Sequence, residues 1–456
     1  MMYIMRPLLG DAASAGELGL LVLTASSPLL LGASADRTAA LAATVYGISV
    51  WAFSFASGEA HGTSVTATLG VVTALGVQAL PTFGVPPVAT ILVCVALIRW
   101  TYDRLVCIHL PSRGMSKLDG MVVVVTGSSA GLGEATAERL LGLGAIVVFA
   151  CRDETRARAA MARACSASAA PASRAIFVPL DVASCASICE CARRVRMLRL
   201  GDSGASRCDA LVCNAGAMHP ERHVSADGWE LNMACHALGH HLLTLLLLPL
   251  LRASSLVGGG RVVAVSSCLH RGADAAAMLA DPMCGYRYGL FDAYARSKLA
   301  QVALTNELQR REPQRLVCVS LHPGNSITEV TRAFHPFVVR AYAAFHFFLK
   351  LVQNPVADGA ATSVFAVAST GVSELRGAYL ERCAIAAPVP AAVDEAIGRS
   401  MWELADRLLR PWLEKGAAAE STQSVTRRRA HASAPTPQRD SSAATASASL
   451  GREGIG

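Results

Sequence analysis

The segment from Met121 to Arg152 constrains the fold of this chain more than any other. Its first apolar run, Val122 to Val125, is β-branched and too short for a helix, which indicates a buried strand. A helix-forming segment follows over Glu134 to Leu143 and stops at Gly144, and the apolar run Ile146 to Ala150 predicts a second strand. This order predicts two parallel strands joined by a helical crossover.

Three glycines, Gly127, Gly131 and Gly133, lie between the first strand and the helix in the spacing G-x-x-x-G-x-G. Glycine lets the backbone approach a pyrophosphate closely, where a Cβ would collide. The helix behind the turn presents its N–H groups and the positive end of its dipole. Because apolar strands flank the glycines, we interpret the segment as half of a dinucleotide-binding fold.

Strands and helices continue to alternate along the chain, which predicts an α/β fold with a doubly wound parallel sheet of the Rossmann type, in a single domain over residues 119–385. Later strands are predicted at Ile176–Leu180, Leu211–Cys213, Arg261–Ser266 and Leu316–Leu321, and helices at Ser184–Arg199, Gly228–Leu251, Leu290–Arg311 and Asp358–Ala368.

Residues 1–104 account for the unusual composition of the chain, which is 52% hydrophobic and only 16% charged, where about 25% charged is ordinary. Long uncharged windows predict three to four transmembrane helices. A cleaved signal peptide with one anchor fits less well, because the windows continue far beyond a usual cleavage point. Basic residues after the last window place the following domain in the cytosol: Arg99, Arg104, Arg113 and Lys117.

The rest of the chain divides by composition. Residues 105–118 form a tether, 386–415 contain a C-terminal helix, and 416–456 are an Ala/Ser/Thr-rich tail predicted to be disordered. Aromatic residues over 330–352 indicate either a substrate lid or a packing or membrane-surface helix. Much of the net charge of +7 lies in the tail, so it gives no case for nucleic-acid binding.

The 14 cysteines contain no C-x-x-C pair and no zinc-like spacing with histidine. We interpret them as reduced thiols and expect no metal site.

Tyr294 and Lys298 are spaced i, i+4 on a predicted helix, which places phenol and ammonium on one face. A tyrosine with a pKa near ~10 is a poor acid or base at neutral pH, and a neighbouring ammonium is expected to lower that pKa. Ser267, at the end of a predicted strand, can hold a substrate oxygen. These three residues are the predicted catalytic group.

In this order, the motifs resemble the short-chain dehydrogenase/reductase family over roughly residues 119–385. They are TGSSAGLG at 126–133, CNAG at 213–216, VSS at 265–267, YARSK at 294–298 and HPG at 322–324. Finer features, such as ACRD at 150–153 and ALGHHLLT at 237–244, are similar to the retinol dehydrogenases and to the oxidoreductase domain of the WW-domain-containing oxidoreductase.

The resemblance implies roles for individual residues. Tyr294 is the general acid/base, Lys298 lowers its pKa and binds the nicotinamide ribose, and Ser267 orients the carbonyl or alcohol. The implied cofactor-binding residues are Thr126, Gly127, Ser129, Gly131, Leu132, Gly133, Arg152, Asp181, Val182, Asn214, Ala215, Gly216, Tyr294, Lys298, Pro323 and Gly324.

The end of the second strand decides between NAD and NADP. An acidic residue there would bind the ribose 2′-hydroxyl, whereas an arginine would favour a 2′-phosphate. Arg152 occupies this place and Asp153 comes one residue later, so we predict NADP, with NAD the less favoured cofactor.

One position departs from the family. An asparagine that usually holds a water in the proton relay behind the lysine is replaced by His236. Histidine can donate or accept a hydrogen bond, so His236 is a further catalytic candidate, with Asn232 one turn earlier as a compensating residue. The alternative is an impaired site.

Two hypotheses follow. The first is a membrane-anchored, NADP-dependent oxidoreductase that interconverts an alcohol and a carbonyl on a lipophilic retinoid, sterol or isoprenoid-like substrate, with the endoplasmic reticulum as the expected membrane. The second is a catalytically impaired, cofactor-binding interaction or regulatory protein. A homodimer stays open in either case.

Overall fold

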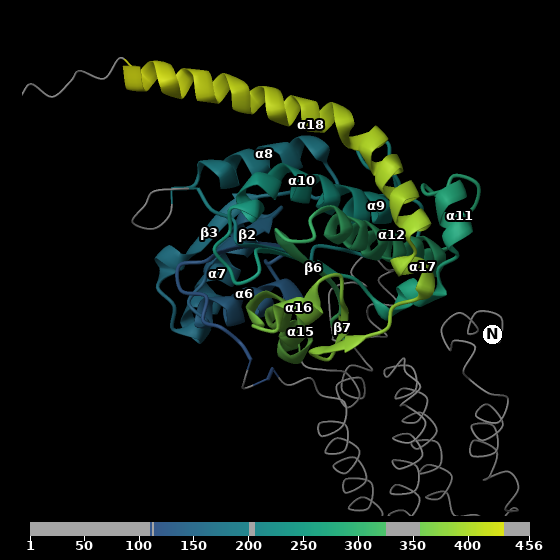
Figure 1. Cartoon of the computed structure of the whole chain (residues 1–456), viewed down its shortest axis with the longest axis horizontal. Helices are drawn as coiled ribbons and strands as arrows, with labels where there is room; N and C mark the ends of the chain where they lie inside the picture. The colour runs from purple at the N-terminus through teal and green to yellow at the C-terminus, as the bar shows by residue number, and fades with distance from the viewer. Residues whose placement is uncertain (1–109, 112–113, 200–205, 325–355, 433–456) are drawn as a thin grey trace, which may run out of the picture. The chain divides into compact units, whose positions relative to one another are not determined.

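The computed structural model describes residues 110–111, 114–199, 206–324 and 356–432 (Figure 1). The predicted membrane region, most of the tether, the aromatic segment 330–352 and the end of the tail lie outside the described residues.

Among the described residues, eight strands form one sheet in the order β3-β2-β1-β4-β5-β6-β7-β8. All neighbours are parallel except β7 and β8, which are antiparallel. The strands are β1 Val122–Thr126, β2 Ile146–Cys151, β3 Ala175–Pro179, β4 Ala210–Cys213, β5 Gly260–Val265, β6 Leu316–His322, β7 Tyr379–Glu381 and β8 Ala384–Ala386. The order reverses between β1 and β4, and their carboxyl ends border the crevice where such sheets bind ligands.

The six predicted strands agree with β1 to β6 to within one residue at each end. The strands β7 and β8 were not predicted, because each has only three residues and no periodicity that a pattern could detect.

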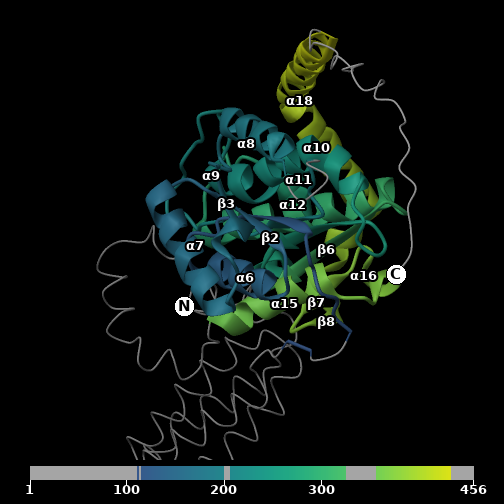
Figure 2. The ribbon, with the colours of Figure 1, turned by 90° about the vertical axis from the view of Figure 1, so that its left-hand side faces the viewer.

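Helices cover both faces of the sheet (Figure 2), so the predicted doubly wound fold is confirmed. Side chains of β1 alternate between the two layers: Val123 and Val125 pack in one and Val122 and Val124 in the other. The first layer contains α6 Gly131–Gly142, α7 Glu154–Ser168 and α15 Val356–Ala368. The second contains α8 Cys185–Met197, α9 Leu231–Met233, α10 Gly239–Arg252 and α12 Leu290–Arg311.

Shorter elements complete the domain: η1 Ala172–Arg174, η3 Cys268–Gly272, α11 Ala275–Ala280, α16 Val372–Leu375 and α17 Pro390–Val393. The last helix, α18, runs from Glu395 to Ala432. It therefore continues past its predicted end at Lys415, and residues 416–432, predicted to be disordered, are helical. Of α18, the part as far as Leu413 belongs to the same compact unit as the sheet.

The predicted helix Gly228–Leu251 contains a π-helical turn, η2 Ala234–Leu238, between α9 and α10. Such turns often occur at functional sites. Directly after it, a Cβ on Gly239 would lie 2.0 Å from the carbonyl oxygen of Val182, so only glycine lets α10 approach the loop after β3. Within the described ranges, Leu231–Arg252 alone is long and apolar enough to cross a membrane, but 72% of its apolar window is buried, as in a core helix.

Candidate active site

The glycine turn after β1 has the backbone shape that the sequence predicts. Gly127 and Gly131 have φ angles of +66° and +58°, which favour glycine. A Cβ on Gly127 would lie 2.9 Å from Ala215 Cα, and one on Gly133 would lie 2.4 Å from the carbonyl oxygen of Gly127. No described atom lies within 4 Å of the Cβ position of Gly131, where α6 begins. The turn is tightly packed on its inner side and open at the helix N-terminus, which fits a pyrophosphate.

Thr126 joins the ends of β1 and β4. Its hydroxyl oxygen accepts hydrogen bonds from the backbone N–H groups of Asn214 and Ala215, both at 2.9 Å. The amide nitrogen of Asn214 donates to the Thr126 carbonyl oxygen at 2.8 Å. These predicted cofactor residues are therefore fixed to one another across the crevice.

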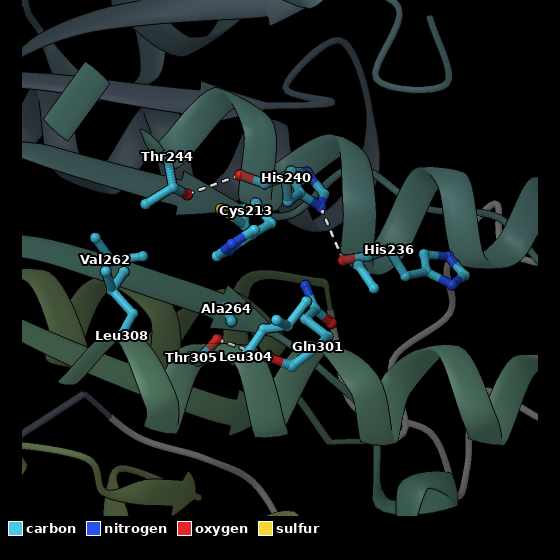
Figure 3. Close-up of a pocket in the computed structure, with 12 residues that line it drawn as sticks. Cys213, His236, His240, Thr244, Val262, Ala264, Gln301, Leu304, Thr305 and Leu308 are labelled. Carbon is cyan, nitrogen blue, oxygen red and sulfur yellow. Dashed lines mark hydrogen bonds between the residues drawn. The ribbon is translucent and has the colours of Figure 1, made fainter. Parts of the chain in front are cut away.

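His240 connects this group to the π-helical turn (Figure 3). Its Nδ1 lies 3.3 Å from the His236 carbonyl oxygen, which can only accept, so Nδ1 carries the proton. Nε2 then accepts a hydrogen bond from the Thr126 hydroxyl at 2.9 Å. Burial lowers the pKa of His240 to about 3, so a neutral imidazole supports the glycine turn. Sequence reasoning gave His240 no role.

At the end of β2, the side chain of Arg152 is exposed. The neighbouring carboxylate of Asp153 accepts a hydrogen bond from the backbone N–H of Arg156 at 2.9 Å and caps the N-terminus of α7. Capping occupies the acidic residue that could have served the ribose 2′-hydroxyl. Arg152 is thus the charged side chain at this position that has no capping role.

The remaining predicted cofactor residues also lie at this edge of the sheet. Ser129 and Leu132 belong to the glycine turn and the start of α6, Asp181 and Val182 follow β3, Gly216 follows β4, and Pro323 and Gly324 follow β6.

Ser267, Tyr294 and Lys298 come together as the sequence predicts. Ser267 follows β5, the other two lie on α12, and all three are buried. The side chain of Ser267 lies close enough to the Tyr294 hydroxyl to lower its pKa. Lys298 Nζ lies 5.7 Å from the centre of the Tyr294 ring and donates to the Val265 carbonyl oxygen at 2.8 Å.

Burial controls the titration of this pair. It raises the pKa of the Tyr294 hydroxyl, and the nearby Ser267 side chain acts in the opposite direction. Burial also lowers the pKa of the Lys298 ammonium, to about 7. Desolvation therefore dominates the titration of both groups in this structure, and the effect of Lys298 on the pKa of Tyr294 stays a prediction.

His236 is fully buried against Tyr294, with the two ring centres 5.2 Å apart and nearly perpendicular planes. Its Nδ1 lies 2.8 Å from Ser297 Oγ, which donates its own proton to the Tyr294 carbonyl oxygen at 2.7 Å. Nδ1 must therefore donate to Ser297, while Nε2 accepts from the backbone N–H of Ala217 at 3.3 Å. Burial lowers the pKa of His236 well below its ordinary value. The imidazole holds the first turns of α12 in place, with both ring nitrogens bound to protein.

Gly216 provides the space that the His236 ring occupies. A Cβ on Gly216 would lie 2.8 Å from His236 Nε2, so the glycine after β4 makes room for the ring. Asn232, considered as a compensating residue, instead donates to Glu230 Oε1 at 2.8 Å and to the Tyr288 hydroxyl at 3.1 Å. Its amide nitrogen therefore serves a separate network.

A second buried histidine supports Ser267. His270 Nδ1 lies 2.7 Å from the Ser267 carbonyl oxygen, and its Nε2 accepts from the backbone N–H of Val389 at 3.2 Å. Burial lowers the pKa of His270 to about 4. Sequence reasoning missed this residue, since its partner lies 119 positions away.

Across the described ranges, no group of three or more His, Cys, Asp or Glu side chains is placed to hold a metal ion. The cysteines described there are free thiols.

Comparison with known proteins agrees with this geometry. Residues 121–337 match the family described as short chain dehydrogenase. Retinol dehydrogenase 14 of Mus musculus is 34% identical over 302 residues, covering 63% of this chain and 86% of that protein. Polyprenol dehydrogenase of Mus musculus is 38% identical over 287 residues, covering 62% and 82%.

The WW domain-containing oxidoreductase of Danio rerio is 32% identical over 302 residues, covering 64% of this chain and 69% of that protein. Both predicted resemblances are thus confirmed. Together with the glycine turn and the buried Ser267, Tyr294 and Lys298, these similarities show that the chain belongs to the short-chain dehydrogenase/reductase family of oxidoreductases.

Proposed function

We propose that this protein is an NADP-dependent oxidoreductase that interconverts an alcohol and a carbonyl on a lipophilic substrate, with Tyr294 as general acid/base. The observation that carries the proposal is that Ser267, Tyr294 and Lys298 are buried together at the sheet edge that holds the glycine turn, with Lys298 Nζ 5.7 Å from the centre of the Tyr294 ring. This edge is where a parallel sheet of this kind binds its ligands.

When bound, the nicotinamide supplies or accepts the hydride. The protein's task is to move one proton at the substrate oxygen. The Tyr294 hydroxyl gives this proton to a carbonyl oxygen during reduction and removes it from an alcohol during oxidation. Ser267 orients the oxygen, and Lys298, with two N–H groups directed at Val265 and Gln301, has a third for the nicotinamide ribose.

Arg152 supports NADP as the cofactor. Its guanidinium is exposed at the end of β2, whereas the carboxylate of Asp153 is engaged at the N-terminus of α7. A guanidinium matches a phosphate in both charge and geometry. Arg152→Glu should lower kcat/KM with NADPH by about 10- to 100-fold and leave the value with NADH nearly unchanged. An equal loss with both cofactors would assign Arg152 no part in the choice.

The names of two relatives, retinol dehydrogenase 14 and polyprenol dehydrogenase, support a lipophilic alcohol or its carbonyl as the substrate. We further propose that residues 1–104 anchor the protein in a membrane, with the catalytic domain on the cytosolic side of the endoplasmic reticulum. Such an anchor would bring the site to substrates that partition into lipid.

The test uses full-length protein in detergent, assayed with both cofactors against retinoid, sterol and polyprenol alcohols and their carbonyl forms. Tyr294→Phe should lower turnover by about 10²- to 10⁴-fold while NADPH binding persists. Binding of NADPH without turnover on the whole panel would favour the alternative, a cofactor-binding interaction protein.

A further inference from the structure

Gln301 lies one helical turn after Lys298 on α12 and is buried. Its Oε1 accepts a hydrogen bond from Lys298 Nζ at 3.2 Å. The other protein acceptor of the ammonium is the Val265 carbonyl oxygen. Because an ammonium can only donate, the oxygen of the Gln301 amide must face Lys298, and its nitrogen must point the other way.

The amide nitrogen of Gln301 points toward the space between α10 and α12 (Figure 3) and has no hydrogen-bond partner among the described residues. An unpaired buried donor destabilises the folded state, so a partner for this nitrogen is expected. A cavity of about 20 Å³ adjoins it, and the lining includes Thr244 and Cys213. This volume suffices for one water molecule. Thr244 already donates to the His240 carbonyl oxygen, so its hydroxyl oxygen can accept from such a water.

The titratable groups around Lys298 are uncharged near neutral pH, which makes the hydrogen bond to Gln301 Oε1 important for stabilising the ammonium. Tyr294 faces it from α12, Cys213 from β4, Cys235 and His236 from η2, and His240 from α10. Burial raises the pKa of both thiols to about 12 and lowers the pKa of both histidines, so all five groups are uncharged near neutral pH. Neutral oxygen atoms, among them Gln301 Oε1, therefore stabilise the ammonium.

We infer that Gln301 is a positioning residue for Lys298: its Oε1 holds the ammonium, and its Nε2 binds one water molecule in the adjoining cavity. The consequence for turnover rests on the proposed function, but the contact with Lys298 does not. Lys298 should therefore respond to changes at Gln301 even when neither cofactor nor substrate is present.

The chain suits a direct measurement, because it contains only four lysines, at positions 117, 298, 350 and 415. Full-length protein labelled with ¹³C at lysine Cε would be titrated by NMR, with Lys298→Arg to assign the signal. Gln301→Leu removes the acceptor and should lower the pKa of Lys298 by about one unit or more. Gln301→Glu supplies an anion and should raise it.

Thr305→Val is the matched control. It removes a hydroxyl that lines the same cavity but donates to the Gln301 backbone carbonyl, so the pKa of Lys298 should stay as in the wild type. Equal titration of Lys298 in wild type and both Gln301 variants would overturn the inference. A crystal structure of the full-length protein should show a water within about 3.2 Å of Nε2, and a dry cavity would refute the water site.

A turnover assay separates this inference from the proposed function. If the wild type is active, the alkaline limb of its pH profile should move to lower pH in Gln301→Leu and to higher pH in Gln301→Glu, because Lys298 must stay charged. If the wild type shows no turnover, the proposed function fails while the lysine titration still decides the role of Gln301.

Discussion

The cofactor half and the catalytic half of this site are held in different ways. Around the glycine turn, Thr126 ties two strand ends together through backbone N–H groups, and glycines remove every Cβ that would obstruct the close approach. Around Tyr294 and Ser267, two buried neutral histidines, His236 and His270, hold the backbone from behind. The first half depends on the Thr126 hydroxyl and on missing Cβ atoms, and the second on two buried imidazole rings, so substitutions should affect the two halves differently.

The largest effect is expected from Gly133→Val. Its side chain would begin 2.4 Å from the Gly127 carbonyl oxygen, so the turn must open. NADPH affinity, measured by fluorescence titration, should fall by about 100-fold or more. Gly142→Ala, in the last turn of α6, is the control, because the nearest atom to its Cβ would be 3.7 Å away. Unchanged affinity in Gly133→Val would show that the cofactor does not bind at this turn.

Acid should destabilise the fold through its buried histidines. Burial lowers the pKa of His240 to about 3 and that of His241 and His270 to about 4, compared with about 6.5 in an unfolded chain. Below about pH 6.5, the unfolded state therefore binds protons at these histidines and the folded state does not. Stability is retained above about pH 6.5 and is lost as the pH falls toward 4, by about 1.4 kcal/mol per pH unit for each histidine.

Thermal melting, followed by tryptophan fluorescence between about pH 7.5 and 5, tests whether stability falls as the pH falls. In wild type the centre of the His241 ring lies 4.7 Å from that of Trp402. His241→Phe keeps an aromatic ring there and should make the melting temperature depend less on pH. A melting temperature that does not change over this range would contradict the assignment of neutral histidines.

His236→Asn examines the catalytic half by restoring the usual family residue. A shorter side chain cannot span the distance from Ser297 to Ala217, so a buried polar group would lose its partner. We expect kcat to fall by about 10-fold, with NADPH affinity unchanged. Higher turnover in the asparagine variant would instead mean that position 236 serves a proton relay.

The smallest effect is expected from Thr126→Val, which keeps the shape but removes the hydroxyl that bonds Asn214, Ala215 and His240. NADPH affinity should fall by about 5- to 10-fold with kcat nearly constant, and Thr126→Ser should behave like the wild type. A loss in kcat alone would place Thr126 in the catalytic half.

Much of the cofactor half, and the pairing of Tyr294 with Lys298 in the catalytic half, could be predicted from the sequence, because these features are local. Strand, glycine turn and helix follow one another within about 30 residues, and the i, i+4 spacing of Tyr294 and Lys298 needs only a helix. The supporting histidines could not be predicted in this way. One partner of each histidine is distant: Thr126 lies 114 positions from His240 and Val389 lies 119 positions from His270, and only the folded chain brings them together.

The partners of His236 could not be predicted from the sequence either. The substitution is visible in the sequence, and it suggested a water-holding group. Its actual partners, Ser297 and Ala217, come from α12 and from the loop after β4. Gly216 is also visible in the sequence. Only the structure shows that it is needed because the His236 ring lies close to where its Cβ would be.

The link made by His240 restricts what can replace it. The side chain must offer a proton at one end to the His236 carbonyl and a lone pair at the other to the Thr126 hydroxyl. In asparagine and glutamine, as in imidazole, the donor and the acceptor are bonded to one carbon, but imidazole holds them on a rigid ring. Glutamine offers both groups only by ordering a longer and more flexible side chain, so mutational scanning at position 240 should favour histidine.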